Sequence, residues 1–212
     1  MMNKFRLLYS KKGSAKYISH LDLMSTMRRS LLRAGVVLSY SQGFNPHPYM
    51  SVALPLSVGC ESKCELIDVA LVENVIPDIS SIKLPGGIEI LDAYVPSRKF
   101  SDIVWTAVCI KLHYNNHAPN ETVDKIAKYL NKNSLIISKR TKRGYKELDI
   151  APFIKDIEIE VKENILLSAK LSAQNPTINA DDLINTFDDE LKPDHIGTTR
   201  VGIYDKNMIE FK

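Results

Sequence analysis

Two histidines near the start of the chain have surroundings that suit acid–base chemistry. His20 follows Ser19, a residue that favours the start of a helix, and His47 stands between Pro46 and Pro48. Metal-independent cleavage of RNA needs a proton donor and a proton acceptor close to one 2′-hydroxyl, and imidazole can serve in either role near neutral pH. His20 and His47 therefore indicate one possible activity, that of an endoribonuclease.

The segment SQGFNPHP (residues 41–48) is typical of a stiff ligand-binding loop. Its prolines restrict the backbone, and Gly43 allows a turn that other residues would strain. Because such a loop positions its side chains before a ligand arrives, binding loses less entropy. Gln42 and Asn45 carry amides that can bind the edge of a nucleobase. Rings that could stack on the base are Tyr40, Phe44 and Tyr49. The alternative is a structural Ω-loop whose amides satisfy its own backbone.

A helix is predicted to begin at Ser19, because Ser19 and Asp22 have the spacing of a capping box. Free backbone N–H groups and the positive end of the helix dipole favour an anion beside His20. Three bases that precede this turn are Lys11, Lys12 and Lys16. We therefore expect a phosphate site, with a histidine that merely packs or caps as the alternative. Because one predicted strand separates the helix from the loop, we expect one cleft to hold His20, Asp22, Gln42, Asn45 and His47.

The hydrophobic pattern predicts the same α+β plan in both halves of the chain. In the first half we expect strands at 5–10, 36–40, 49–56, 64–73 and 88–96. The helix should bury Leu21, Met24, Met27, Leu31 and Ala34 and project Arg29 and Arg33 from another face. In the second half we expect helices at 121–132 and 179–191, with strands at 105–114, 134–140, 157–172 (a hairpin) and 200–205. The fold class predicted is α+β, with two tandem ferredoxin-like units, residues 1–96 and 105–212, whose antiparallel sheets carry their helices on one face.

Basic residues are concentrated in two regions of a chain whose net charge is only +3. Residues 1–50 hold eight Lys and Arg against one acid, and KRTKRGYK (residues 139–146) holds five bases and no acid. Such clusters on an otherwise acidic chain predict local anion-binding surfaces, although solvated faces are the alternative. The second cluster resembles the tip of a β-hairpin that could follow an RNA backbone and stack on a base. Its candidate RNA-binding residues are Lys139, Arg140, Lys142, Arg143, Tyr145 and Lys146.

Several classes of protein lack support in the sequence. The three cysteines, Cys60, Cys64 and Cys109, have neither zinc spacing nor the CxxxCxxC run of a radical-SAM cluster. The Walker A, GxGxxG and GxSxG motifs are absent from the sequence. We therefore expect no metal and no cofactor. No apolar run approaches the ~18–20 residues that span a bilayer, and the first residues carry charges where a signal peptide is apolar, so we expect a cytoplasmic protein.

The motifs SHLDLM (19–24), RAG (33–35) and SQGFNPHP resemble those of the bacterial radical-SAM-linked protein family, a domain of unknown function. The similarity is specific over residues 4–73 and weaker in the second half, where KRGYKELDIAP fits. It implies a separately encoded B12-type radical-SAM protein as partner. Because members are encoded near ribonuclease E/G and ribosomal protein genes, it also implies a role in RNA or ribosome metabolism. The tandem plan is also similar to that of CRISPR RNA-processing endonucleases of the repeat-associated class.

These observations favour a non-catalytic RNA-binding accessory protein that presents tRNA or rRNA to a separate radical-SAM enzyme. Its expected RNA-binding residues in the first half are Lys11, Lys12, Lys16, His20, Asp22, Arg29, Arg33, Gln42, Phe44, Asn45 and His47. The endoribonuclease with His20 and His47 is one alternative. A protein–protein adaptor without RNA contact is the other, since an acidic partner would also satisfy the basic segments.

Overall fold

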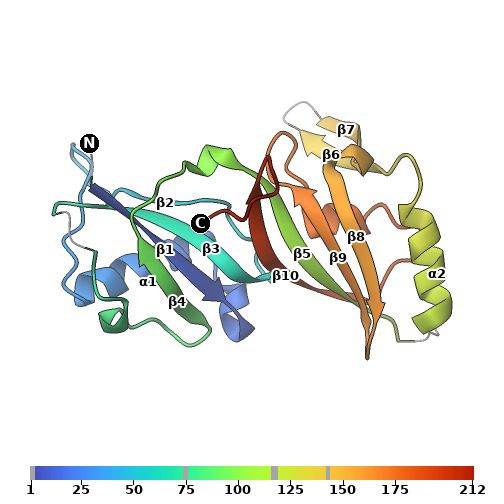
Figure 1. Ribbon diagram of the computed structural model, residues 1–212, viewed down its shortest axis with the longest axis horizontal. Coiled ribbons are helices and arrows are strands. Elements are labelled where there is room, and N and C mark those ends of the chain that lie inside the picture. Colours follow the sequence, from blue (N-terminus) through green and yellow to red (C-terminus); the bar gives the residue numbers. More distant parts are fainter. Residues whose placement is uncertain (1–2, 74–75, 116–118, 142–143) are drawn as a thin grey trace. The chain divides into compact units, whose positions relative to one another are not determined.

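The computed structural model in Figure 1 describes residues 3–73, 76–115, 119–141 and 144–212, apart from the side chains of 119–120 and 140–141. The chain divides into two compact units, and the division falls between Asp102 and Ile103. Both units combine antiparallel strands with few helices, as the predicted α+β class requires. Within the described residues, every helix is too short or too polar to cross a bilayer.

The first unit is an antiparallel sheet in the order β4-β1-β3-β2. Its strands are β1 (Asn3–Lys11), β2 (Met50–Val52), β3 (Glu61–Leu71) and β4 (Ile88–Tyr94). Its helix is α1 (His20–Arg33), and shorter 3-10 helices are η1 (Gly13–Tyr17), η2 (Ile79–Ser81) and η3 (Phe100–Asp102). The strand predicted at 36–40 makes only isolated bridges, Leu38 with Leu71 and Tyr40 with Pro48.

Helix α1 covers one face of this sheet. Alternate residues of β1, beginning with Phe5 and Leu7, share a core with Met27 and Leu31 of α1. The predicted burial of Leu21 is wrong, because its side chain is 76% exposed. The buried stripe instead consists of Leu23, Met27, Ser30 and Leu31, while Met24 and Ala34 are partly buried at its edges. The predicted burial of Met27 and Leu31 is confirmed, and the error is confined to Leu21, because two residues along a helix turn by about 200° and Leu21 therefore points away from the side on which Leu23 is buried.

The second unit has a main antiparallel sheet in the order β10-β5-β9-β8 and a separate hairpin of β6 and β7. The strands of the main sheet are β5 (Ile103–His113), β8 (Ile154–Val161), β9 (Ile165–Ser172) and β10 (His195–Asp205). The hairpin strands are β6 (Ile136–Thr141) and β7 (Gly144–Asp149). The helices are α2 (Pro119–Leu130), α3 (Ala180–Ile184) and the 3-10 helix η4 (Ala151–Phe153).

Two expectations for this half need correction. The strand predicted at 134–140 is not part of the repeated sheet, because it pairs with β7 as a hairpin. The helix predicted at 179–191 ends at Ile184, although Phe187 and Leu191 beyond it are still buried. Helical spacing of apolar residues therefore marked burial correctly there but overestimated the length of the helix. Residues of α2, α3, β6, β5 and β9 share one hydrophobic core.

Tyr114 ties the end of β5 to the segment after α3, and its titration gives a test of this unit. Its hydroxyl donates to the Leu191 carbonyl at 2.6 Å. Burial raises the pKa of Tyr114 to about 12, and the Asp194 carboxylate adds to the rise. Between the unfolded value of about 10 and pH 12, the unfolded chain loses this proton while the folded chain keeps it. The free energy of unfolding should therefore fall as pH rises through this window.

Urea unfolding at pH 9 and pH 11 measures this contribution against Tyr114→Phe, which cannot ionise. After allowance for solvent screening, the unmodified protein should lose about 1 kcal/mol more than the variant over this interval. Equal losses in the two proteins would show that Tyr114 titrates as an exposed tyrosine does.

Candidate nucleic-acid interface

The SQGFNPHP loop is closed at its base by Ser41 and His47. The Ser41 backbone N–H donates to the His47 carbonyl at 2.8 Å, and the His47 N–H donates to Ser41 Oγ at 3.0 Å. Gly43 takes a φ of 125°, a conformation that favours glycine. This closure leaves exposed the side chains of Gln42, Phe44, Asn45 and His47, with the Phe44 ring fully exposed. The loop therefore has a fixed base and presents one ring, two amides and an imidazole to solvent.

This loop and the start of α1 lie at opposite ends of the first sheet. The loop returns to β3 at Ala70, whose N–H donates to the Tyr49 carbonyl at 2.9 Å. The start of α1 follows Lys11, which pairs with Ser62 at the other end of β3. Eight residues of strand separate Ser62 from Ala70, which corresponds to about 26 Å at ~3.3 Å per residue. The expected shared cleft of His20, Asp22, Gln42, Asn45 and His47 is therefore wrong.

The physical reason is that α1 itself carries the chain along the sheet (Figure 1). After α1, Leu38 bridges Leu71, which also pairs with Asn3 at the start of β1. The predicted strand at 36–40 would have carried the chain back towards His20, but those residues do not run along the sheet. An acid and a base must each reach within ~3 Å of a reacting group, so one molecule cannot use His20 and His47 as a pair.

At the start of α1, the predicted cap is confirmed and the predicted phosphate site is weakened. Ser19 Oγ accepts from the Asp22 N–H at 3.1 Å and donates to Asp22 Oδ2 at 2.7 Å. Asp22 is thus engaged with Ser19. Lys11 is only 2% exposed, and its ammonium group points to the Ile18 carbonyl at 3.5 Å, so a phosphate in solvent cannot reach it. The groups that stay accessible here are Lys12, Lys16 and His20.

Two of the three arginines of α1, Arg29 and Arg33, are exposed, but they differ in their contacts. Arg33 donates to Ser30 Oγ at 2.7 Å and approaches the Lys83 carbonyl at 3.5 Å. Arg29 extends from the same helix into solvent. Neither lies at the loop or at the start of α1, so the eight bases of residues 1–50 do not form one surface.

The β6–β7 hairpin presents a ring and a cation. Tyr145 is 76% exposed and stands opposite Arg140, and the exposed Lys146 stands opposite Lys139. Like charges at opposite positions destabilise a hairpin, and Asp182 offsets this by binding Lys139 Nζ at 2.8 Å. Lys139 also donates to the Thr177 carbonyl at 2.6 Å, so it anchors the hairpin rather than extending into solvent. Lys142, Arg143 and the side chain of Arg140 lie outside the described residues.

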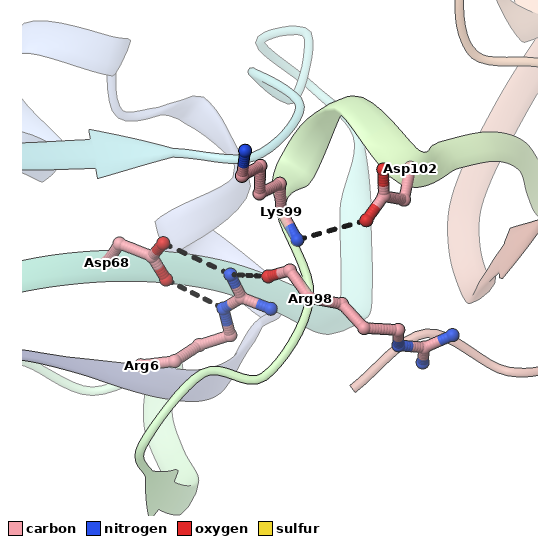
Figure 2. A network of polar contacts seen from close by, with 5 residues as sticks. All are labelled: Arg6, Asp68, Arg98, Lys99 and Asp102. Carbon is pink, nitrogen blue, oxygen red and sulfur yellow. Dashed lines mark hydrogen bonds and ion pairs between the residues drawn. The ribbon is translucent and has the colours of Figure 1, made fainter.

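One base of the N-terminal cluster has a structural role that charge counting missed. Arg6 has 0% exposure and donates to both carboxylate oxygens of Asp68, at 2.6 and 3.0 Å. It also donates to the Arg98 carbonyl at 2.9 Å, and its guanidinium lies 4.3 Å from the centre of the Phe100 ring. Figure 2 shows this network joining β1, β3 and the segment after β4. The signal in the sequence was Asp68, a single acid inside the apolar run LIDVAL.

A hollow of about 190 Å³ lies between β1 and the residues that follow the loop. Its lining residues are Lys4, Pro48, Tyr49, Met50, Ser51, Asp68 and Ala70. Of these, Tyr49 was considered from the sequence as a ring that could stack, and Pro48 as a residue that stiffens the loop. Lys4 and Ser51 were not singled out, because nothing local in the sequence places them together.

No metal site accompanies these features in the part of the chain that the structure describes. There, no group of three or more His, Cys, Asp or Glu side chains is placed to hold an ion. Cys60, Cys64 and Cys109 are partly buried, and none of the three is in a disulfide.

A comparison with protein-family models decides the family. The model described as "uncharacterized protein conserved in bacteria (DUF2344)" matches residues 4–180. The chain belongs to this family. The bacterial domain of unknown function expected from the SHLDLM and SQGFNPHP motifs is thereby confirmed. The link of this DUF2344 protein to radical-SAM chemistry stays a prediction.

Other comparisons add little to the family match. No curated protein matches this DUF2344 chain. The chain is also similar to a solved structure, that of Thermus thermophilus Cse3 bound to an RNA representing a pre-cleavage complex. The two share 12% sequence identity, and the TM-score is 0.21. The match covers 92% of this chain and 98% of that chain. A similarity this weak supports no argument about fold or function.

Proposed function

We propose that this DUF2344 protein is a cytoplasmic RNA-binding accessory protein that presents tRNA or rRNA to a separate radical-SAM enzyme. The observation that carries the proposal is an exposed aromatic ring on a hydrogen-bonded segment in each unit. Phe44 stands on the closed loop with exposed amides beside it, and Tyr145 stands on the hairpin beside Lys146. Rings of this kind stack on unpaired bases, and neighbouring cations follow the phosphates.

Hydrogen bonds hold the ends of both segments in place, and this supports a binding role over a purely structural one. The loop is closed through Ser41 and the hairpin is anchored through Lys139 and Asp182, so neither segment uses Phe44 or Tyr145 to hold its shape. A ring that is held in solvent by a closed backbone loses little conformational entropy when a base stacks on it. This arrangement supports recognition of single-stranded RNA in preference to a rigid duplex.

We also propose the finer fold, two tandem ferredoxin-like units. The supporting observation is that the main sheets share one antiparallel order, in which the fourth strand, the first, the third and the second lie side by side. In the second unit the β6–β7 hairpin is then an insertion that follows α2. An inserted basic hairpin on a common scaffold favours a functional role, since loops of a rigid scaffold carry function more often than its core.

A protein partner has a separate supporting observation. Three apolar side chains are exposed at the start of α1 and the adjoining turn, namely Tyr17, Leu21 and Val58. The turn is joined to η1 because the Gly59 N–H donates to the Lys16 carbonyl at 2.9 Å. Neighbouring exposed apolar groups favour a protein contact. This surface suits the radical-SAM partner, and it also keeps the adaptor without RNA contact as the second candidate function.

Fluorescence anisotropy with a single-stranded RNA separates the two candidates. Phe44→Ala and Tyr145→Ala should each weaken binding by about 5- to 150-fold, the loss expected for one stacked base. The slope of log affinity against log salt should change little, because each phosphate contact contributes roughly −0.7 and neither ring is charged. Lys146→Ala should instead reduce the slope by about that amount.

Tyr17→Ala serves as the matched control, because it removes an exposed ring that we assign to protein contact. Its RNA affinity should equal that of the unmodified protein, while capture of the co-expressed radical-SAM protein should decrease. If the unmodified protein shows no affinity for RNA near physiological salt, the RNA-binding proposal is wrong and the adaptor remains.

A further inference from the structure

The hollow between β1 and the loop lies where Lys4, Ala70 and Tyr49 follow one another across the sheet. On one side, Lys4 of β1 stands directly opposite Ala70. On the other side, the Ala70 N–H donates to the Tyr49 carbonyl at 2.9 Å. Residues directly opposite in an antiparallel pair share a face, so the longer side chain of Lys4 stands beside the short Ala70. Ala70 itself is only 1% exposed, and it forms part of the lining of the hollow of about 190 Å³ together with Lys4 and Tyr49.

This hollow opens on the face of the first sheet that α1 does not cover. Phe5 and Val69, the neighbours of Lys4 and Ala70, pack into the core beneath α1. Successive side chains of a strand point to opposite faces, so Lys4 and Ala70 point away from that core. Ser51 stands opposite Asp68 and lines the hollow with it. The site is therefore built from β1, β3 and β2 together.

The charge of the hollow favours an anion. Lys4 is exposed, and the only carboxylate among the lining residues belongs to Asp68. Both oxygens of Asp68 already accept from Arg6, at 2.6 and 3.0 Å. Arg6 neutralises the Asp68 carboxylate, so the charge that remains beside the hollow is the positive charge of the exposed Lys4. A phosphate group beside Lys4 would thus not meet an unneutralised carboxylate.

An aromatic wall stands on the other side of the hollow. The Tyr49 side chain is 41% exposed, and its backbone is fixed by two hydrogen bonds, from its N–H to the Ser39 carbonyl and from Ala70 to its own carbonyl, both at 2.9 Å. Sites for whole small molecules usually measure ~300–1,000 Å³, so a hollow of this size suits a single flat ring. An exposed ring, a hydroxyl and a cation around such a space match a base, its edge and its phosphate.

We propose that this hollow binds one nucleotide of single-stranded RNA, with its base on Tyr49, its phosphate at Lys4 and the Ser51 hydroxyl at the base edge. The proposal rests on the RNA-binding function and names a subsite for it. It places this subsite directly after the SQGFNPHP loop, whose exposed Phe44 then contacts an adjacent nucleotide of the same strand. The class of ligand that this subsite would bind is a 5′-nucleotide.

NMR titration of the full chain with 5′-UMP, 5′-AMP and uridine tests the subsite directly. Amide shifts should concentrate at Lys4, Tyr49, Ser51 and Ala70, and the nucleotides should bind more tightly than uridine, which lacks the phosphate. Lys4→Ala should abolish this preference for the phosphate. Tyr49→Leu, which keeps bulk but removes the aromatic ring, should weaken nucleotide binding about five-fold or more. Ala70→Val should block binding by filling the hollow.

The matched control is Lys63→Ala, which removes another exposed lysine of the same sheet and should leave nucleotide binding unchanged. The exposed position of Lys4 makes its variant safe for folding, so a failure of Ala70→Val to fold leaves the test intact. Shifts elsewhere, or none, would overturn the subsite, and RNA affinity that persists in Lys4→Ala and Tyr49→Leu would show that the RNA-binding function survives without it. Nucleotide binding at the hollow in a protein with no affinity for RNA would instead retain the site and contradict that function.

Discussion

Replacement of Arg6 by alanine is expected to lower the free energy of unfolding of the first unit by about 3–5 kcal/mol. Arg6 has no exposed surface, and Asp68, its partner at 2.6 Å, has a side chain that is only 15% exposed. The substitution leaves this carboxylate without its cation in a place where water hardly reaches it. It also removes the donor to the Arg98 carbonyl (Figure 2). The cation beside the Phe100 ring is lost as well.

The control is the double variant Arg6→Leu, Asp68→Leu, which replaces both charges by apolar side chains. Such replacement of a buried pair is often neutral or stabilising, so the double variant should regain most of the stability that Arg6→Ala loses. Urea unfolding of all three proteins measures the difference. A loss below about 1 kcal/mol for Arg6→Ala, the usual value of a surface pair, would show that water screens the network.

The sequence predicted those features of the fold that local signals determine. The composition of FRLLYS and the near-alternation of CELIDVALVE predicted β1 and β3, and the Ser19–Asp22 spacing predicted the first residue of α1. Pairing depends on contacts between distant segments, which no local pattern reveals. Residues 134–140 have the composition of a strand in either sheet, and only the register with β7 shows that they belong to a hairpin. The predicted length of α3 was wrong for a related reason, because buried apolar residues continue past the end of the helix.

The features of the candidate site also differ in whether local sequence could predict them. The exposure of the SQGFNPHP loop follows from its polar and glycine-containing sequence, and it could be predicted. The separation of His20 from His47 could not, because it depends on the direction in which α1 crosses the sheet. Counting charges also failed for Arg6 and Lys11, because burial and pairing are decided by register. The hollow at Ala70 forms only when three strands pair in register, so no sequence motif could predict it.

Substitution of Gly87 by alanine is the second change for which we expect a large loss of stability. Gly87 has a φ of 88°, and a Cβ there would lie 2.4 Å from the Lys12 carbonyl oxygen and 2.9 Å from the Ala15 Cβ. The Lys12 N–H donates to the Gly87 carbonyl at 2.7 Å, so the two segments cannot separate without losing this bond. The strained φ and the backbone collision together should cost about 2–5 kcal/mol.

Two neighbouring glycines divide this cost into its causes. Gly86 has open space and no unusual φ, so Gly86→Ala should change the free energy of unfolding little. Gly13 has a φ of 59° and open space, so Gly13→Ala should carry the conformational cost alone, about 1–2 kcal/mol. Urea unfolding should therefore rank the variants Gly86, Gly13 and Gly87 in order of increasing loss. If Gly87→Ala proves no worse than Gly13→Ala, the contact with Lys12 is looser than the structure indicates. Gly87 lies at the opposite end of the sheet from Ala70, so the folded Gly87→Ala variant should keep its nucleotide affinity. Its added methyl group collides with Lys12 and Ala15, which lie beside and within η1, so capture of the protein partner at Tyr17 should decrease.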